Sequence, residues 1–258
     1  MASNSIRQRG LRRAWFVLIA LAAALLPQVA RAGQSGWALL RKDYPAIRDI
    51  SFEILERFPP QDYVYVPVGG SPAPIARFIE NLEVARVENL PISDMRRWKG
   101  FTKAKITPRF KRKFFNHIGR YLPDAQEMGG KKILLIDFAA TGDTLRNTAA
   151  LVAEYSRQAG LEAEVEAVAL GRDDFRGRKL AFIRHVISLR RYPTLNENLN
   201  NDAHRWASQY DKAPWDDLPR GHLRTRQGYI ELGKKLGRQM NTDPVVDRWK
   251  AAHAIHNG

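Results

Sequence analysis

Cysteine is absent from the 258 residues of this chain, which excludes disulfide bonds, thiolate nucleophiles and cysteine-ligated metals. The sequence also lacks a Gly-Lys-Ser/Thr phosphate loop, so an ATPase of that type is not expected. Acidic residues are scarce: 27 Asp and Glu stand against 42 Lys and Arg, which gives a formal net charge of +15. Such a basic surface favours phosphates, nucleic acid or an anionic membrane as partners, without choosing among them.

Long apolar runs are missing too, because the run from Ala14 to Leu26 is shorter than the roughly 20 residues of a membrane span. It follows an arginine-rich segment, and Ala30-Arg31-Ala32 comes after it, as in a signal-peptidase site. We therefore expect residues 1–32 to be a signal peptide, cleaved before Gly33, that exports the protein to the periplasm or the medium. An uncleaved membrane anchor is the alternative.

The remaining chain, residues 33–258, has the composition of one globular domain, since 44% of all residues are hydrophobic and 27% are charged. Apolar, β-branched runs alternate with helical patterns over a core of about residues 60–171. This alternation predicts an α/β fold, a parallel sheet with helices on both faces. Residues 172–258 are expected to form an irregular and helical cap with a C-terminal helix. Expected strands are Tyr63 to Val68, Glu83 to Leu90, Ile133 to Ile136 and Glu162 to Leu170, and expected helices are Ala73 to Leu82, Phe114 to Leu122 and Leu145 to Gln158.

The segment with the clearest chemistry is Ile133 to Leu145, which reads ILLIDFAATGDTL. A buried strand ends there, and a tight turn opens a helix. Main-chain N–H groups at a helix start, together with the helix dipole, favour an anion. Gly142 leaves room for a phosphate to approach, and Asp137 can accept hydrogen bonds from sugar hydroxyls.

This segment resembles the phosphoribosyl-pyrophosphate loop of the type I phosphoribosyltransferase family. The family pattern has two acids before the loop; the second falls on Asp137, whereas the first falls on Ile136, which cannot serve as an acid. The resemblance covers about Tyr63 to Leu170. It implies a phosphoribosyltransferase-like fold in which Asp137 is the catalytic residue that holds a ribose hydroxyl. The residues that it implies for the 5′-phosphate are Thr141, Gly142, Asp143 and Thr144.

A second loop fits the same resemblance. Gly69, Gly70 and Ser71 follow the first expected strand, at the place where the family binds pyrophosphate through main-chain N–H groups, with Mg²⁺ bridging. An ordinary Gly-Gly-Ser-Pro turn is the competing interpretation. The basic stretch from Ser93 to Lys113 stands where relatives carry a mobile loop, although a solvated surface is the plainer interpretation. No metal ligands are expected among the protein side chains.

Two functions are consistent with these patterns. The first is a phosphoribosyltransferase-like protein that binds a phosphorylated ribose or nucleotide and transfers or cleaves a ribose-phosphate group. The second is a non-catalytic, exported binding module on the same fold, which recognises a phosphate-bearing ligand, nucleic acid or an anionic surface through its basic face. Ile136 in place of an acid counts against full enzymatic activity.

Overall fold

The computed structural model describes residues 41–90, 92, 108–139, 142–171, 182–193, 195 and 223–254. The chain divides into two units, residues 1–42 and 43–258, and nearly all described residues belong to the second. The proposed signal peptide therefore lies outside the described residues. No helix in the described part is both long and apolar enough to cross a membrane.

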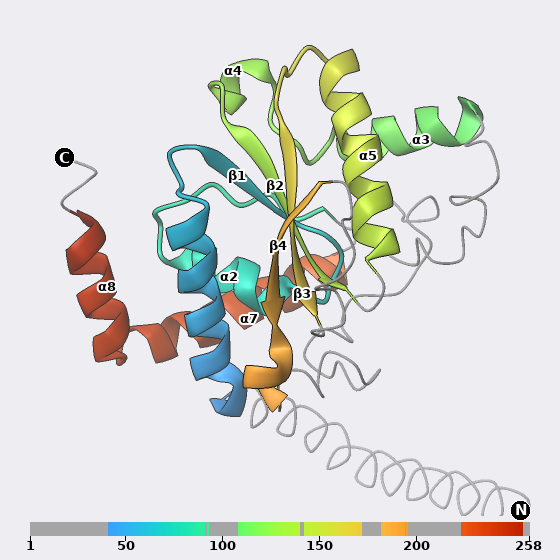
Figure 1. Ribbon diagram of the computed structural model, residues 1–258. Coiled ribbons are helices and arrows are strands. Elements are labelled where there is room, and N and C mark those ends of the chain that lie inside the picture. Colours follow the sequence, from blue (N-terminus) through green and yellow to red (C-terminus); the bar gives the residue numbers. More distant parts are fainter. Residues whose placement is uncertain are drawn as a thin grey trace, which may run out of the picture. The chain divides into compact units, whose positions relative to one another are not determined.

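The centre of the second unit is an all-parallel sheet in the order β1-β2-β3-β4 (Figure 1). The strands are β1 (Tyr63–Pro67), β2 (Lys132–Ala139), β3 (Val165–Gly171) and β4 (Ile183–Ser188). β2 and β3 are largely apolar and buried because both faces of a parallel sheet are covered. The α/β class and the parallel sheet are thus as the sequence predicts.

A further segment, residues 86–90, runs along the free side of β1. It pairs in parallel through the bridges Tyr65–Val87 and Val68–Leu90. In space the order is therefore 86–90, β1, β2, β3, β4, so the second segment in the chain lies outside the first. In such a sheet the direction of winding reverses between β1 and β2, and the carboxyl ends of these two strands form the topological switch point.

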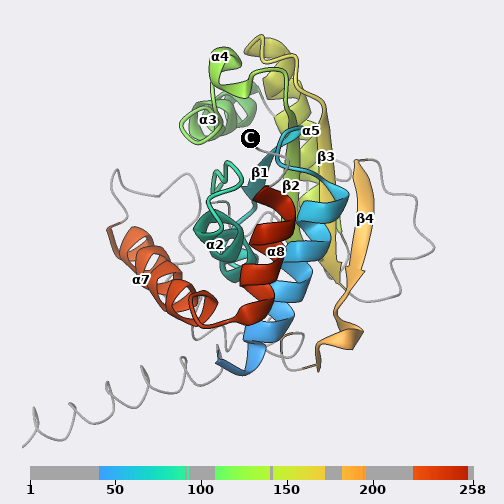
Figure 2. The same ribbon diagram turned by 90° about the vertical axis from the view of Figure 1, so that its left-hand side faces the viewer.

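Helices cover both faces of the sheet. They are α2 (Ala73–Asn81), α3 (Pro108–Ile118), α4 (Ala125–Met128), α5 (Asp143–Gln158), α7 (Leu223–Met240) and α8 (Pro244–Ala254), with one more helix over residues 41–57. α5 packs on β2 and β3, and a core on its side joins Leu135, Val152 and Ala167. The helix of residues 41–57 lies on the other face, where Phe58 contacts Tyr63 and Tyr65. Figure 2 shows α8 alongside it.

Two features differ from the sequence-based expectation. α3 begins at Pro108 rather than Phe114, so the last part of the basic stretch is helical. β4 lies in the region after Gly171, where the pattern is too weak to indicate a strand. The end of the chain is helical, as expected, with α7 beginning at Leu223. Residues 172–181 and 196–222 of the expected cap, and residues 93–107, lie outside the described residues.

Candidate functional site

The two glycine loops of the candidate site follow neighbouring strands. β1 and β2 pair in parallel, with Pro67 opposite Ile136, so the chain leaves both strands at the same edge of the sheet. Gly69 and Gly142 therefore lie at one edge, and that edge is the switch point. In open α/β sheets, ligands bind in the crevice outside the carboxyl ends of the strands at this point.

Gly142 sets the start of α5. Its backbone is left-handed, with φ 78° and ψ −4°, and its carbonyl accepts the first bond of the helix from the Arg146 N–H at 2.9 Å. Only glycine adopts this conformation without cost, so the turn itself requires a glycine here. No side chain caps the start of α5. Such an end presents main-chain N–H groups and the positive end of the dipole.

Asp137 lies five residues before this turn on β2, and only 8% of its surface is exposed. Side chains alternate across a strand, so Asp137 faces the same side as Ile133 and Leu135, which is the side that α5 covers. Its neighbour Ile136 faces the opposite side and is 1% exposed. The structure thus separates the two positions that correspond to the family's acid pair and leaves a single carboxylate toward α5.

The first loop is held tightly against its neighbours. The Gly69 N–H donates to the Leu90 carbonyl at 2.9 Å, and the Val68 N–H donates to Ile136 at 2.8 Å. Gly69 has φ 76°, and a Cβ there would stand 2.7 Å from the Ile92 carbonyl oxygen. The packing of this loop therefore requires a glycine at position 69 whether or not the loop binds an anion.

α2 starts directly after this loop, again without a side-chain cap, and unlike α5, which begins at Asp143, it has no acidic residue in its first turn. Two helix N-termini, those of α2 and α5, thus stand at the same edge of the sheet. The sequence predicts an anion at both loops, at the start of α5 and, through the family resemblance, at Gly69, Gly70 and Ser71; Pro72 and Pro74 mark the start of α2. Gly70, Ser71 and Thr144 are among the described residues of this edge, whereas Thr141 and the side chain of Asp143 are outside the described part.

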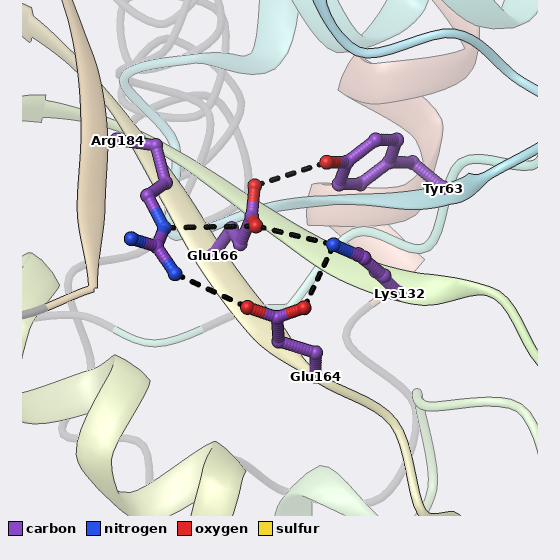
Figure 3. Close-up of polar contacts among 5 residues, drawn as sticks. All are labelled: Tyr63, Lys132, Glu164, Glu166 and Arg184. Atoms are coloured by element: carbon purple, nitrogen blue, oxygen red, sulfur yellow. Dashed lines mark hydrogen bonds and ion pairs between the residues drawn. The ribbon is translucent and has the colours of Figure 1, made fainter.

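A separate charged cluster lies at the opposite, amino edge of the sheet (Figure 3). Lys132 contacts Glu164 at 2.7 Å and Glu166 at 3.5 Å, and the Tyr63 hydroxyl donates to Glu166 at 3.0 Å. Arg184 joins both carboxylates, at 3.1 and 3.6 Å. Two carboxylates meet two cations, so this cluster is balanced and ties the four strands together.

These contacts have the expected electrostatic effects. The hydrogen bond with Glu164 raises the pKa of Lys132, and the same bond lowers the pKa of Glu164. Burial, followed by the hydrogen bond to Glu166, raises the pKa of the Tyr63 hydroxyl. The cluster lies at the end of the strands remote from both glycine loops, so it does not contribute to the candidate site.

Within the described residues, no group of three or more His, Asp and Glu side chains could hold a metal ion. Two surface grooves are lined by described residues, one between α3 and α5 and one between α2 and α7, and neither includes the glycine loops. Comparison of the chain with protein-family models, with curated proteins and with solved structures finds no match. The functional inference therefore depends on the residues and the topology.

Proposed function

We propose that this protein binds a phosphorylated ribose or a nucleotide at the carboxyl edge of the sheet, between the loops that follow β1 and β2. The observation that carries the proposal is the placement of both glycine loops at the switch point, where two uncapped helix N-termini meet. The 5′-phosphate would bind to main-chain N–H groups around Gly142. The 69–71 loop would take a second phosphate or pyrophosphate.

Asp137 is the residue proposed to hold a ribose hydroxyl, because it is the buried carboxylate on the α5 side of β2. Mg²⁺ would arrive with pyrophosphate, since Mg²⁺ in such sites is held largely by substrate phosphates and water. Transfer of the ribose-phosphate group is the activity that the family resemblance implies. The isoleucine at position 136 provides no second carboxylate and faces away from α5. The site is therefore better suited to binding the ligand than to efficient transfer of the ribose-phosphate group.

Calorimetric titration and thermal shift test this proposal, with ribose 5-phosphate, phosphoribosyl pyrophosphate and nucleoside monophosphates as ligands, each with Mg²⁺. Free ribose is the control for the phosphate. A specific ligand at 100 times its dissociation constant should stabilise the fold by about 2.7 kcal/mol. Asp137→Asn should weaken binding about ten- to a hundred-fold, the value of one hydrogen bond to a charged group.

Gly142→Asn is the sharper variant, because asparagine tolerates a positive φ whereas Gly142→Val would strain the turn. We expect Gly142→Asn to fold and to lose phosphate binding, since its side chain occupies the phosphate approach. Gly160→Asn is the matched control: Gly160 has φ 66°, lies just beyond the other end of α5 and has open space around it. Equal ligand affinity in the two asparagine variants would refute the phosphate loop.

A further inference from the structure

The groove between α3 and the last turns of α5 lies on a different part of the molecule from the glycine loops. Its volume is about 640 Å³. Tyr155 and Ala159 line this groove, and both lie at the end of α5 that is remote from Gly142. Tyr155 lies thirteen positions after Gly142 along α5, or roughly 20 Å at 1.5 Å per residue. The lining of the groove includes Lys111, Arg112, Phe115, Asn116, Arg120 and Tyr155.

Two of the cations in the groove have no acidic partner in the described part of the chain. Lys111 is paired with Glu154 at 2.7 Å. Arg112 and Arg120 line the same groove, both are exposed, and neither has an acidic partner among the described residues. Arg112 lies on α3, and Arg120 lies in the turn just beyond the end of α3, eight positions further along the chain. Asn116 lies midway and adds an amide that can donate hydrogen bonds.

Aromatic rings also line the groove. Phe115 of α3 and Tyr155 of α5 meet edge to face, with ring centroids 5.7 Å apart, and both remain half-buried. Gly119 permits this arrangement, because a Cβ there would stand 2.5 Å from the Tyr155 hydroxyl oxygen. Unpaired arginines beside partly exposed aromatic rings are the combination that binds single-stranded nucleic acid, in which phosphates contact cations and bases stack on rings.

We propose that this groove binds the phosphodiester backbone of a single-stranded nucleic acid, through Arg112 and Arg120, with a base stacked on the aromatic rings. A strand can enter a groove between two helices, whereas a bilayer surface contacts protruding residues. The site is separate from the proposed phosphate loop and is independent of it. The proposed site includes part of the C-terminal end of the basic stretch, residues 108–113, which lies on α3.

Fluorescence anisotropy with a labelled 20-nucleotide oligothymidylate tests the proposal on the full chain over a salt series. The double variant Arg112→Gln/Arg120→Gln should bind more weakly, and its slope of log affinity against log salt should be shallower by about 1.4, which corresponds to two lost phosphate contacts. The matched control is Arg248→Gln/Lys250→Gln, which removes two exposed charges from α8. This control should keep the wild-type slope.

A second variant tests the aromatic part independently of charge. Tyr155→Leu should lower affinity about five-fold or more while it leaves the salt slope unchanged, because stacking does not release counterions. Melting temperatures establish that each variant is folded. Equal slopes in the two double variants would overturn the proposal. So would vesicles of phosphatidylglycerol that bind in a groove-dependent manner while the oligonucleotide does not.

Discussion

Adjacent residues of β2 have different roles because their side chains face different sides of the sheet. Asp137 is directed to the α5 side, near the switch point, and Ile136 is buried beneath the other face. The alignment with the phosphoribosyltransferase pattern treats these positions as equivalent members of an acid pair. In this structure an acid at position 136 would enter an apolar layer, so the isoleucine has a packing role.

Replacement of Ile136 tests this difference. Ile136→Asp should lower the free energy of unfolding by about 3–5 kcal/mol, because a buried carboxylate without a partner is costly. Ile136→Val is the control and should cost about 0.5–1.5 kcal/mol. Urea unfolding measures both. A stable Ile136→Asp protein with tighter pyrophosphate binding would instead place this side chain in the site.

At the scale of elements, the helix over residues 41–57 and α8 are joined by contacts between distant parts of the chain. Phe52 stacks on Trp249 with ring centroids 4.8 Å apart and 4° between the planes. Arg48 Nη1 donates to Asp243 Oδ2 at 2.9 Å, and Asp243 also accepts from the Val245 N–H at 2.9 Å, at the start of α8. One carboxylate thus caps one helix and anchors another.

The pKa of Asp243 makes this junction sensitive to acid. Burial alone would raise the pKa, but the Val245 N–H and the Arg48 guanidinium hold it below its ordinary value. A lowered pKa in the folded state means that the stabilisation is present above the ordinary pKa of about 3.9 and is lost as the pH falls through the folded value. Asp243→Asn should therefore be less stable than wild type by about 1.5 kcal/mol at pH 7, with the gap closing below about pH 4.

Urea unfolding at pH 7, 5, 4 and 3 measures that gap. Glu56→Gln is the control: Glu56 is exposed, lies on the same helix as Arg48 and has no ion-pair partner among the described residues. It should change stability by no more than about 0.5 kcal/mol at each pH. A difference between wild type and Asp243→Asn that stayed constant or grew at low pH would show that the Asp243 charge does not stabilise the junction.

Elements with a strong local pattern could be predicted from the sequence, and elements set by distant contacts could not. α2, β2, α5 and β3 carry continuous apolar runs or helical spacing, and their expected positions agree with the structure within a few residues. β4 is an edge strand, only partly buried, so its exposed Arg184 and half-buried His185 break the pattern of a central strand. The amino-edge cluster depends on strand register, which single-sequence patterns do not specify.

The same difference between local patterns and distant contacts applies to the candidate site. The sequence indicated the loops around Gly69 and Gly142, because glycine, hydroxyl residues and a strand end have local signatures. Their meeting at one edge depends on the pairing of β1 with β2, and residues 68–131 intervene between these strands in the chain. Likewise, Lys111 and Arg112 belong to an evident basic run, whereas Arg120 and Tyr155 join them only through the packing of α3 on α5.

At the scale of the whole molecule, the basic charge of the chain does not depend on the proposed export signal. The formal net charge is +15, and five arginines lie in the first 32 residues, which contain no acid. The rest of the chain is therefore basic by itself, and the proposed binding of phosphates needs no charge from residues 1–32. We propose export to the periplasm or the medium because the basic segment, the apolar run and Ala30-Arg31-Ala32 have the order of a cleavable signal.

Expression in a bacterial host, followed by mass spectrometry of the cell fractions, tests export. The expected product is a chain that begins at Gly33 and is found outside the cytoplasm, because small residues at positions 30 and 32 fit the peptidase. Ala32→Arg should block cleavage and leave the uncut chain in the membrane fraction. Gln34→Arg, with the same charge change just past the cleavage point, controls for the added charge and should still be cut. A membrane-bound, full-length wild-type chain would establish the anchor instead, since an uncleaved apolar run holds the protein at the bilayer.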